Sequence, residues 1–248
     1  MKIIQIKKYW IFTLFLCLIL SIQAQNNTDY IYDFPINPNT SEWENLKTET
    51  ERFNAMQIPI DLLKSMSTEN LIVTCINYPA FGHYTAFNNI QDGINRTINN
   101  FNGLQELFAR QDAPSKMVSF YSQFGISNSD NKNINTDFWW MRLCYFEFLL
   151  AKEEIIDKLN EDENKYLIKE AHKKIIDKIN EKEQKSLYNI QSTLLIIAKV
   201  LDKYNYVDFQ QKRKENIEIE IFLHSGSITN LLLVDNMIEM ASDFSNSK

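Results

Sequence analysis

Apolar side chains recur at every third or fourth position along most of the chain, which is the spacing of one face of an α-helix. The clearest set runs from Leu187 to Tyr204 in steps of three and four. A second set, from Phe87 to Phe101, follows the same steps. This repetition predicts an all-α fold, built as an irregular multi-helix bundle or as stacked helical hairpins.

Short polar residues mark where several of the predicted helices begin. Two pairs have the spacing of a capping box, in which a hydroxyl and a carboxylate three positions apart accept hydrogen bonds from free amides. The pairs are Ser41 with Glu44 and Thr48 with Glu51. Ser67 is expected to cap another helix, which runs to Tyr78 and stops before a proline.

The middle of the chain predicts one helix and then a loop. Asp112, followed by a proline two positions later, is expected to cap a helix that ends at Gly125 in a left-handed backbone conformation. Residues 125–136 are polar and rich in Asn and Ser. They predict a long surface loop or a boundary between two helical subdomains.

Residues Phe138–Leu150 predict a helix that is apolar all round, which is typical of a central, buried helix. Arg142 is unexpected in such a helix, because a buried guanidinium must find a carboxylate or a carbonyl partner. One interpretation is a buried ion pair or a side chain that extends to the surface. The other is an anion-recognition point within a pocket.

Two further stretches have patterns that allow more than one interpretation. Residues 155–161 and 175–181 are near-copies of each other. We interpret both as helix ends with a left-handed Asn cap, at Asn160 and Asn180, although drift in a stretch rich in Lys, Glu and Ile explains the likeness equally well. Residues 217–222 alternate like a strand, but no partner strand lies nearby, which favours a helix.

Residues 1–24 have the pattern of a signal peptide, with lysines first, then the apolar stretch Tyr9–Leu20, then Ala24. We expect cleavage after Ala24 and therefore a secreted, periplasmic or cell-surface protein without a transmembrane span. A membrane anchor that is kept is the competing interpretation. The mature chain would consist of an N-terminal arm, residues 25–40, and a helical domain, residues 41–248.

Composition and charge exclude several classes of protein. Gly and Pro each supply only 5 of the 248 residues, which argues against an all-β sandwich and a Rossmann-type fold because both need many tight turns. The formal net charge is −6, and the first 24 residues hold three lysines and no acid, so the mature chain is more acidic still. This charge disfavours nucleic acids and anionic membranes as partners.

Residues that carry metal or cofactor chemistry are few. The chain has 3 His, and its sequence contains no HExxH motif, no Cys-x-x-Cys motif and no Gly-rich phosphate loop. We therefore expect no metal and no cofactor, and we assign no catalytic, cofactor-binding or metal-binding residue. Glu220 and His224 would share a helix face like a metal half-site, but a chance surface contact explains that spacing as well.

The cysteines after residue 24 allow a catalytic and a structural interpretation. Cys75 with His83 is a candidate nucleophile and base. Against this, Cys75 lies in an apolar run, where a small thiol is usually buried. We expect Cys75 and Cys144 in the core on facing or neighbouring helices. The pattern leaves open whether they form a disulfide.

Aromatic residues at the surface are candidates for stacking on a sugar ring or a peptide. They are Tyr30, Tyr32, Trp43 and Trp140.

Five short stretches carry a resemblance to other proteins. They are Met66–Glu69, Thr74–Pro79, Phe81–Gly82, Phe87–Asn88 and Phe101–Leu107. Over residues 41–125 the chain thus resembles a family of uncharacterised, exported, all-helical proteins of Gram-negative bacteria, and its signal ending in Ala-Gln is similar too. The resemblance implies export and an all-α fold, and it brings no activity and no catalytic residue.

These patterns together predict an exported, non-enzymatic helical binding or interaction protein whose partner is a protein, a peptide or a glycan. A hydrolase that uses Cys75 and His83 is one alternative, and it would require a reactive thiolate in a pocket. A sugar-binding or peptide-binding protein that uses exposed aromatics is the other alternative.

Overall fold

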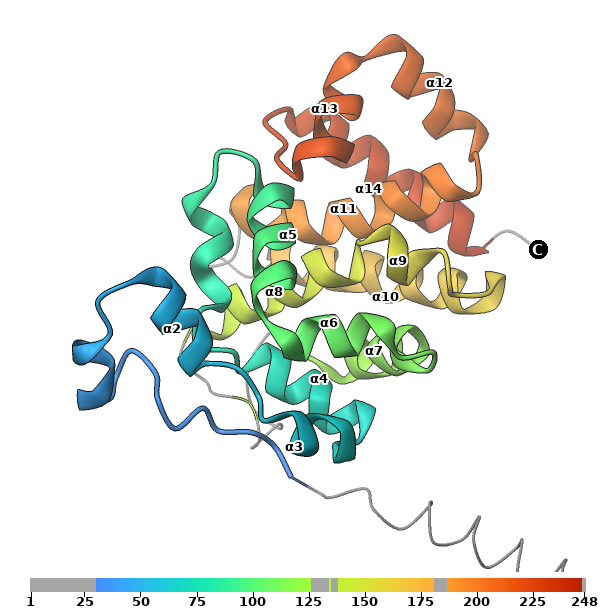
Figure 1. Ribbon diagram of the computed structural model, residues 1–248. Helices are drawn as coiled ribbons and strands as arrows, with labels where there is room; N and C mark the ends of the chain where they lie inside the picture. The colour runs from blue at the N-terminus through green and yellow to red at the C-terminus, as the bar shows by residue number, and fades with distance from the viewer. Residues whose placement is uncertain (1–29, 126–133, 135–137, 181–186, 247–248) are drawn as a thin grey trace, which may run out of the picture.

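The structure, a computed structural model, describes residues 30–125, 134, 138–180 and 187–246. Helices are the only regular secondary structure in these residues, which confirms the predicted all-α class (Figure 1). No helix in the described part of the chain is long and apolar enough to cross a membrane. The predicted signal peptide and most of the loop predicted at residues 125–136 lie outside the described residues.

The elements are named in chain order, with η for a 3₁₀ helix. In the first half they are η1 (Ser41–Asn45), α2 (Glu49–Ala55), α3 (Ile60–Ser65), α4 (Thr68–Ile76), η2 (Phe81–Ala86), α5 (Ile90–Asn100), α6 (Asn102–Ala109) and α7 (Ala113–Gln123). In the second half they are α8 (Trp139–Leu150), α9 (Glu153–Ile156), α10 (Glu161–Asn180), α11 (Leu187–Lys203), α12 (Val207–Glu215), α13 (Ile217–Ser225) and α14 (Leu231–Asn246).

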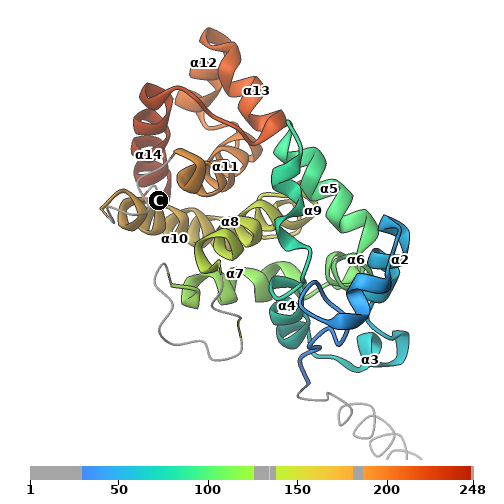
Figure 2. The same ribbon diagram turned by 90° about the vertical axis from the view of Figure 1, so that its left-hand side faces the viewer.

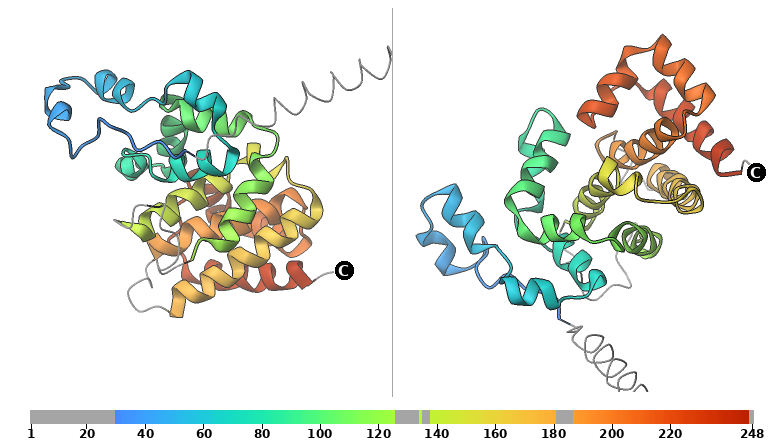
Figure 3. Two further views of the ribbon diagram at one scale, coloured as in Figure 1. Left: turned by 90° about the horizontal axis from the view of Figure 1, so that it is seen from below. Right: turned by 45° about the vertical axis from the view of Figure 1, so that its right-hand side comes forward.

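The two longest helices, α10 and α11, pack against each other, and α14 packs against both (Figure 3). Helix α8 lies against α11, and α7 lies against α10. The earlier helices α4, α5 and α6 form the other side of the molecule, and α13 comes back to touch α5 (Figure 2). Segments from the two halves of the sequence therefore meet along α5.

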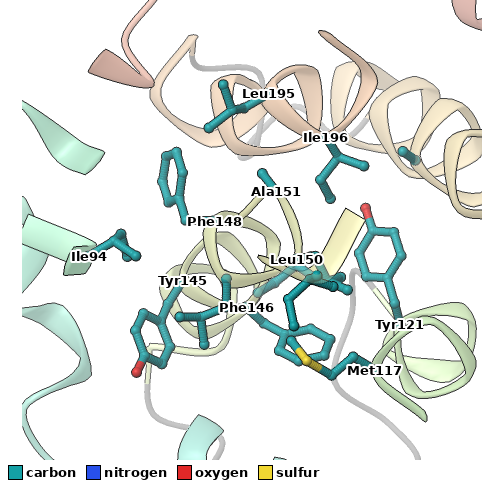
Figure 4. Packing of buried hydrophobic residues seen from close by; sticks show 14 of the residues in the cluster. Ile94, Met117, Tyr121, Tyr145, Phe146, Phe148, Leu150, Ala151, Leu195 and Ile196 are labelled. Carbon is teal, nitrogen blue, oxygen red and sulfur yellow. The ribbon is translucent and has the colours of Figure 1, made fainter. Parts of the chain in front are cut away.

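Helix α8 occupies the middle of the core, as its apolar sequence predicted. Every residue from Arg142 to Leu150 is buried. Its side chains face several helices at once: Tyr145, Phe146, Phe148 and Leu150 are surrounded by residues of α5, α7 and α11 (Figure 4). These neighbours include Ile94, Met117, Tyr121, Leu195 and Ile196. A helix packed on all sides needs no polar face.

Two of the predicted helix caps are present. The Glu51 amide donates to Thr48 Oγ1 at 3.1 Å, and the Thr48 amide donates to Glu51 Oε2 at 2.9 Å. The Asn70 amide donates to Ser67 Oγ at 3.2 Å, so Ser67 caps α4. This helix ends at Ile76, two residues before the predicted end at Tyr78.

Two other predicted caps, at Ser41 and Asp112, are wrong. Neither side chain accepts a hydrogen bond from an amide of the helix that it was expected to cap. Ser41 lies inside η1, whose N-cap residue Thr40 instead donates its hydroxyl proton to the Asn37 carbonyl at 2.9 Å. The Asp112 carboxylate accepts from the Thr68 hydroxyl at 2.9 Å and makes no side-chain cap on α7. Both caps were predicted from local spacing alone.

Two predicted left-handed helix ends also differ from the structure. Helix α7 ends at Gln123 and leaves through Phe124 in an extended conformation, with φ −78° and ψ 93°, one residue before Gly125. Asn160 caps the start of α10 instead of an end, because its Oδ1 accepts from the Glu163 amide at 2.9 Å. Asn180 is the last residue of α10, and the residues that follow it, 181–186, lie outside the described part.

The alternating stretch at residues 217–222 is helical, as predicted, and belongs to α13. This helix ends at Gly226, whose φ of 76° is in the left-handed region. At the other end of the chain, residues Tyr32 and Phe34 are buried, and the Tyr32 amide donates to Thr74 Oγ1 at 3.2 Å. This part of the predicted arm therefore adds to the core.

Candidate functional site

A pocket of about 320 Å³ lies where α2, η2 and α5 meet, and we call it the aromatic pocket. The residues that give it its character are Glu49, Phe53, Tyr78, His83, Phe87 and Arg96. The course of the chain brings these residues together. Helix α4 ends before Pro79, the short 3₁₀ helix η2 follows, and Asn89 then caps α5, with its Oδ1 accepting from the Asp92 amide at 3.2 Å.

Aromatic rings and one ion pair build the walls of the aromatic pocket. The rings of Phe53 and His83 lie edge to face with centroids 6.3 Å apart. Arg96 Nη2 lies 2.8 Å from Glu49 Oε2, and the guanidinium stands 5.9 Å from the ring centroid of Phe87. This ion pair is largely exposed and joins α2 to α5 beside the pocket.

Tyr78 forms a buried part of the wall. Its side chain is 1% exposed, and its ring stacks on Phe101 with centroids 4.1 Å apart. No group among the described residues makes a hydrogen bond with its hydroxyl. Burial raises the pKa of this phenol above its ordinary value, so it stays neutral and can both donate and accept.

The predicted pair of Cys75 and His83 lacks the features of a nucleophile and base. Cys75 is 1% exposed, and burial raises the pKa of its thiol. His83 is an exposed residue of η2 and lines the aromatic pocket, whereas Cys75 does not line it. A thiolate nucleophile needs a lowered pKa and access to substrate, and Cys75 has neither.

Both cysteines of the described part are buried free thiols, as the burial prediction required. Cys75 lies on α4 and Cys144 on α8, and these helices touch each other. Burial raises the pKa of the Cys144 thiol as well. The disulfide that the sequence left open is absent between these two residues.

The four aromatic residues that the sequence nominated differ in their exposure. Tyr30 is 42% exposed, but Tyr32 is buried in the core, which contradicts its expected exposure. Trp43 and Trp140 are half-buried, and the Arg52 guanidinium lies 5.5 Å from the Trp43 ring centroid. The aromatic pocket uses other rings, and its only signal in the sequence was the dense run of aromatics around Pro79.

Arg142 finds a carbonyl partner, as expected for a buried guanidinium. Its side chain is 5% exposed, Nη1 donates to the Ile76 carbonyl at 2.5 Å, and the guanidinium lies 4.1 Å above the ring centroid of Phe81. It also lines a pocket of about 630 Å³ together with Asp33 and Asn77. The N-terminal arm thus forms part of a second hollow.

A network of buried polar side chains surrounds Glu147 on α8, and the sequence did not reveal it. Glu147 is 0% exposed, and Lys178 Nζ on α10 lies 2.6 Å from its Oε2. Three hydroxyls donate to the same carboxylate: Tyr121 at 2.8 Å, Ser192 at 2.6 Å and Thr193 at 2.9 Å. The charge is therefore matched by an opposite charge and by hydrogen bonds from three further helix positions.

The remaining donors of Lys178 are used within the same network. Its Nζ donates to the Asn189 carbonyl and to Thr193 Oγ1, both at 2.9 Å. The Cys144 thiol points to the same carbonyl, with Sγ 3.6 Å from the oxygen. Neither Glu147 nor Lys178 lines the aromatic pocket or either of the two larger pockets, so we interpret the network as part of the structural core.

A third hollow, of about 520 Å³, lies between the two halves of the chain, and we call it the junction pocket. Helix α5 forms one side, and α9, α11 and α13 form the other. His224 lines it, while Glu220 points elsewhere and pairs with Arg213 at 2.5 Å and 2.9 Å. The predicted pair of Glu220 and His224 is thus divided between two contacts.

Within the described residues, no three His, Cys, Asp or Glu side chains are close enough together to hold a metal ion. The aromatic pocket is therefore the candidate site, because it combines apolar walls with a few polar groups, as pockets for small organic ligands do. No protein-family model, curated protein or solved structure matches the chain.

Proposed function

We propose that the chain is an exported binding protein that holds one sugar ring in the aromatic pocket and performs no reaction on it. The observation that carries this proposal is the combination of ring walls with one exposed ion pair: Phe53 and Phe87 line the pocket, and Arg96 Nη2 lies 2.8 Å from Glu49 Oε2 beside them. Apolar walls with a few hydrogen-bonding groups match the faces and the edge of a sugar ring.

The walls favour a sugar over an aliphatic peptide side chain. A pyranose presents C–H groups on its faces, which pack against rings such as Phe53 and Phe87, and hydroxyls at its edge. The Glu49 carboxylate accepts hydrogen bonds from such hydroxyls, and the Arg96 guanidinium donates them. An aliphatic side chain has no polar group with which to bond Glu49 or Arg96. The volume is near the lower end of the range for small-molecule sites, about 300–1,000 Å³, which suits a single ring.

Export is the second part of the proposal and rests on the sequence of residues 1–24. Their lysines, apolar stretch and terminal Ala24 have the pattern of a cleaved signal peptide. N-terminal sequencing of protein recovered outside the cytoplasm is expected to begin at Gln25. Recovery of an intact N-terminus from membranes would contradict this part.

The binding test compares two cations of exposed ion pairs. Arg96→Met removes the guanidinium that lines the pocket, and Lys116→Met removes an ammonium group, paired with Glu69, that does not line it. Binding of methyl pyranosides is measured by saturation-transfer NMR and titration. We expect Arg96→Met to weaken binding about fivefold, because one hydrogen bond contributes about 1 kcal/mol, and Lys116→Met to bind like wild type.

A second variant tests the apolar wall. Phe53→Ala removes a half-buried ring of the pocket and is expected to weaken binding of the same methyl pyranosides about fivefold or more through lost stacking. The proposal is wrong if no pyranoside binds, or if Lys116→Met weakens binding as much as Arg96→Met does.

Thiol labelling separates this binding protein from the hydrolase alternative. A hydrolase that uses Cys75 requires an accessible thiolate, whereas burial and the raised pKa keep this thiol protonated and covered. Iodoacetamide is expected to label native protein at least about a hundredfold more slowly than protein in urea, because labelling then requires local opening. Fast labelling of Cys75 in the native protein would favour the hydrolase.

A further inference from the structure

The junction pocket has more negative than positive groups, and the positive groups already have partners within the chain. Lys199 Nζ lies 2.8 Å from Glu153 Oε1, so this lysine is already paired. Lys152 Nζ donates to Asn95 Oδ1 at 2.7 Å. Both ammonium groups of the pocket thus have partners from its own walls.

Three carboxylates of the junction pocket have no such partner. Asp92 on α5 and Glu154 and Asp157 beside it on the α9 side line the pocket, and no cation of the described residues lies within 4.0 Å of any of them. The hollow therefore has a surplus of hydrogen-bond acceptors that carry negative charge. A positively charged group that enters it would be attracted by all three.

Gln91 gives a second and independent indication of a ligand. Its side chain is 7% exposed and lines the junction pocket, and its amide makes no hydrogen bond with any described residue. Gly226 lies next to this side chain: a Cβ added to that glycine would be 3.6 Å from Gln91 Cγ. The amide itself is not sealed from solvent, so water or a ligand in the pocket can supply its hydrogen bonds.

The volume of the pocket and the lack of a three-ligand group among the described residues favour an organic cation over a bare metal ion. The described residues hold no cluster of three ligands tight enough for a metal, yet the pocket measures about 520 Å³. An alkyl chain with an ammonium group at each end can reach acceptors on both sides of such a hollow. Its ammonium groups donate three hydrogen bonds each, to carboxylates and to the Gln91 amide oxygen.

We propose that the junction pocket binds a small aliphatic diamine or polyamine, with its ammonium groups on Asp92, Glu154 and Asp157 and on the amide of Gln91. This site is separate from the aromatic pocket and does not depend on the sugar proposal. Because α5 supplies one wall and α9, α11 and α13 supply the other, the ligand would also join the two halves of the chain.

The test uses 1,4-diaminobutane and spermidine as probes on the full purified protein, by isothermal titration calorimetry at low and at physiological ionic strength. We expect saturable binding of one molecule that weakens with salt. Asp157→Asn is expected to weaken binding about threefold to fivefold, as for a partly exposed ion pair. Gln91→Leu is expected to weaken it about tenfold through a lost hydrogen bond to a charged group.

Controls separate a specific site from general attraction to an acidic protein. Asp243→Asn removes one exposed carboxylate on α14 and should leave the affinity unchanged. Tyr78→Phe, in the aromatic pocket, should also bind the diamine like wild type. Thermal unfolding followed by circular dichroism verifies that each variant is folded, and Asp157→Asn carries the test alone if Gln91→Leu does not fold.

Three results would overturn the proposal. The first is the absence of saturable binding of both amines at low ionic strength. The second is an equal loss of affinity in Asp157→Asn and Asp243→Asn, which would show attraction by net charge. The third is binding of magnesium ions or of butylamine as tightly as the diamine, which would show that the two ammonium groups do not act together.

Discussion

The polar cluster around Glu147 and the junction pocket both gather charged groups at places where helices meet, yet they differ in how far their bonding capacity is used. Glu147 and Lys178 are fully enclosed, and the carboxylate is met by an ammonium group and three hydroxyls. The Gln91 side chain is 7% exposed and makes no hydrogen bond with a described residue, and the neighbouring carboxylates Asp92, Glu154 and Asp157 have no cation of these residues within 4.0 Å. The first cluster joins helices, and the second leaves hydrogen-bonding capacity to water or to the amine that we propose.

The largest effect is expected from breaking the complete network. Glu147→Gln leaves the Lys178 ammonium group buried without an opposite charge. We expect this change to lower the free energy of unfolding by about 3–5 kcal/mol. The free energy of unfolding is measured by urea denaturation. Lys116→Met, which breaks the exposed pair of Lys116 with Glu69, is the control and should cost less than about 1 kcal/mol. Equal losses in both variants would contradict the contrast drawn above.

A smaller effect is expected at the glycine behind Gln91. Gly226 has a φ of 76°, and a Cβ there would lie 3.3 Å from Phe148 Cε1. Gly226→Ala is therefore expected to lose about 1–2 kcal/mol of unfolding free energy, because L residues disfavour the left-handed region. Gly82→Ala, whose Cβ would have ordinary contact with Met141 at 3.4 Å, is the control and should be close to neutral in the same denaturation experiment. An equal loss of unfolding free energy in both variants would show that the left-handed backbone at Gly226 does not cause the effect.

The smallest effect concerns Lys152 in the junction pocket. Burial lowers the pKa of this ammonium group below its ordinary value, and the nearby charge of Glu154 opposes this only in part. The folded chain therefore binds this proton more weakly than the unfolded chain does. The charged lysine lowers the free energy of unfolding by its full amount at pH values below the pKa of the folded state. This loss disappears as the pH rises from that pKa to the unfolded value of about 10.4.

Lys152→Met removes that titration. The variant is expected to differ from wild type by about 0.5 kcal/mol or less at pH 7. Wild type should gain stability relative to the variant as the pH rises toward about 10.4 and its ammonium group loses its proton. Urea denaturation across this pH range measures the difference. A constant difference, or one that changes in the opposite direction, would show that desolvation does not dominate at this lysine.

The elements that could be predicted from the sequence depend on neighbours along the chain. The stripe from Leu187 onward is α11, and the apolar run after Phe138 is α8. The capping box of Thr48 and Glu51 formed as well, since both residues reach each other within one helical turn. Scarce Gly and Pro already excluded folds that are rich in turns.

Other predictions failed where a distant residue competed for a side chain. Asp112 binds the hydroxyl of Thr68, 44 positions away, in place of the amides of its own helix. Asn160 was expected to end one helix and caps the next, because Glu163 completes a reciprocal pair with it. Spacing along the chain cannot rank a local partner against one that only packing brings near.

By itself, the sequence determined the helical class, most helix positions, the burial of both cysteines and the need of Arg142 for a polar partner. Only the tertiary structure decided which polar groups lie close together. Glu147 meets residues up to 46 positions away, and the junction pocket combines α5 with α13. The physical reason is that a helix exposes its side chains around its whole circumference, and only the packing of other helices selects which of them are buried together and which remain without a partner.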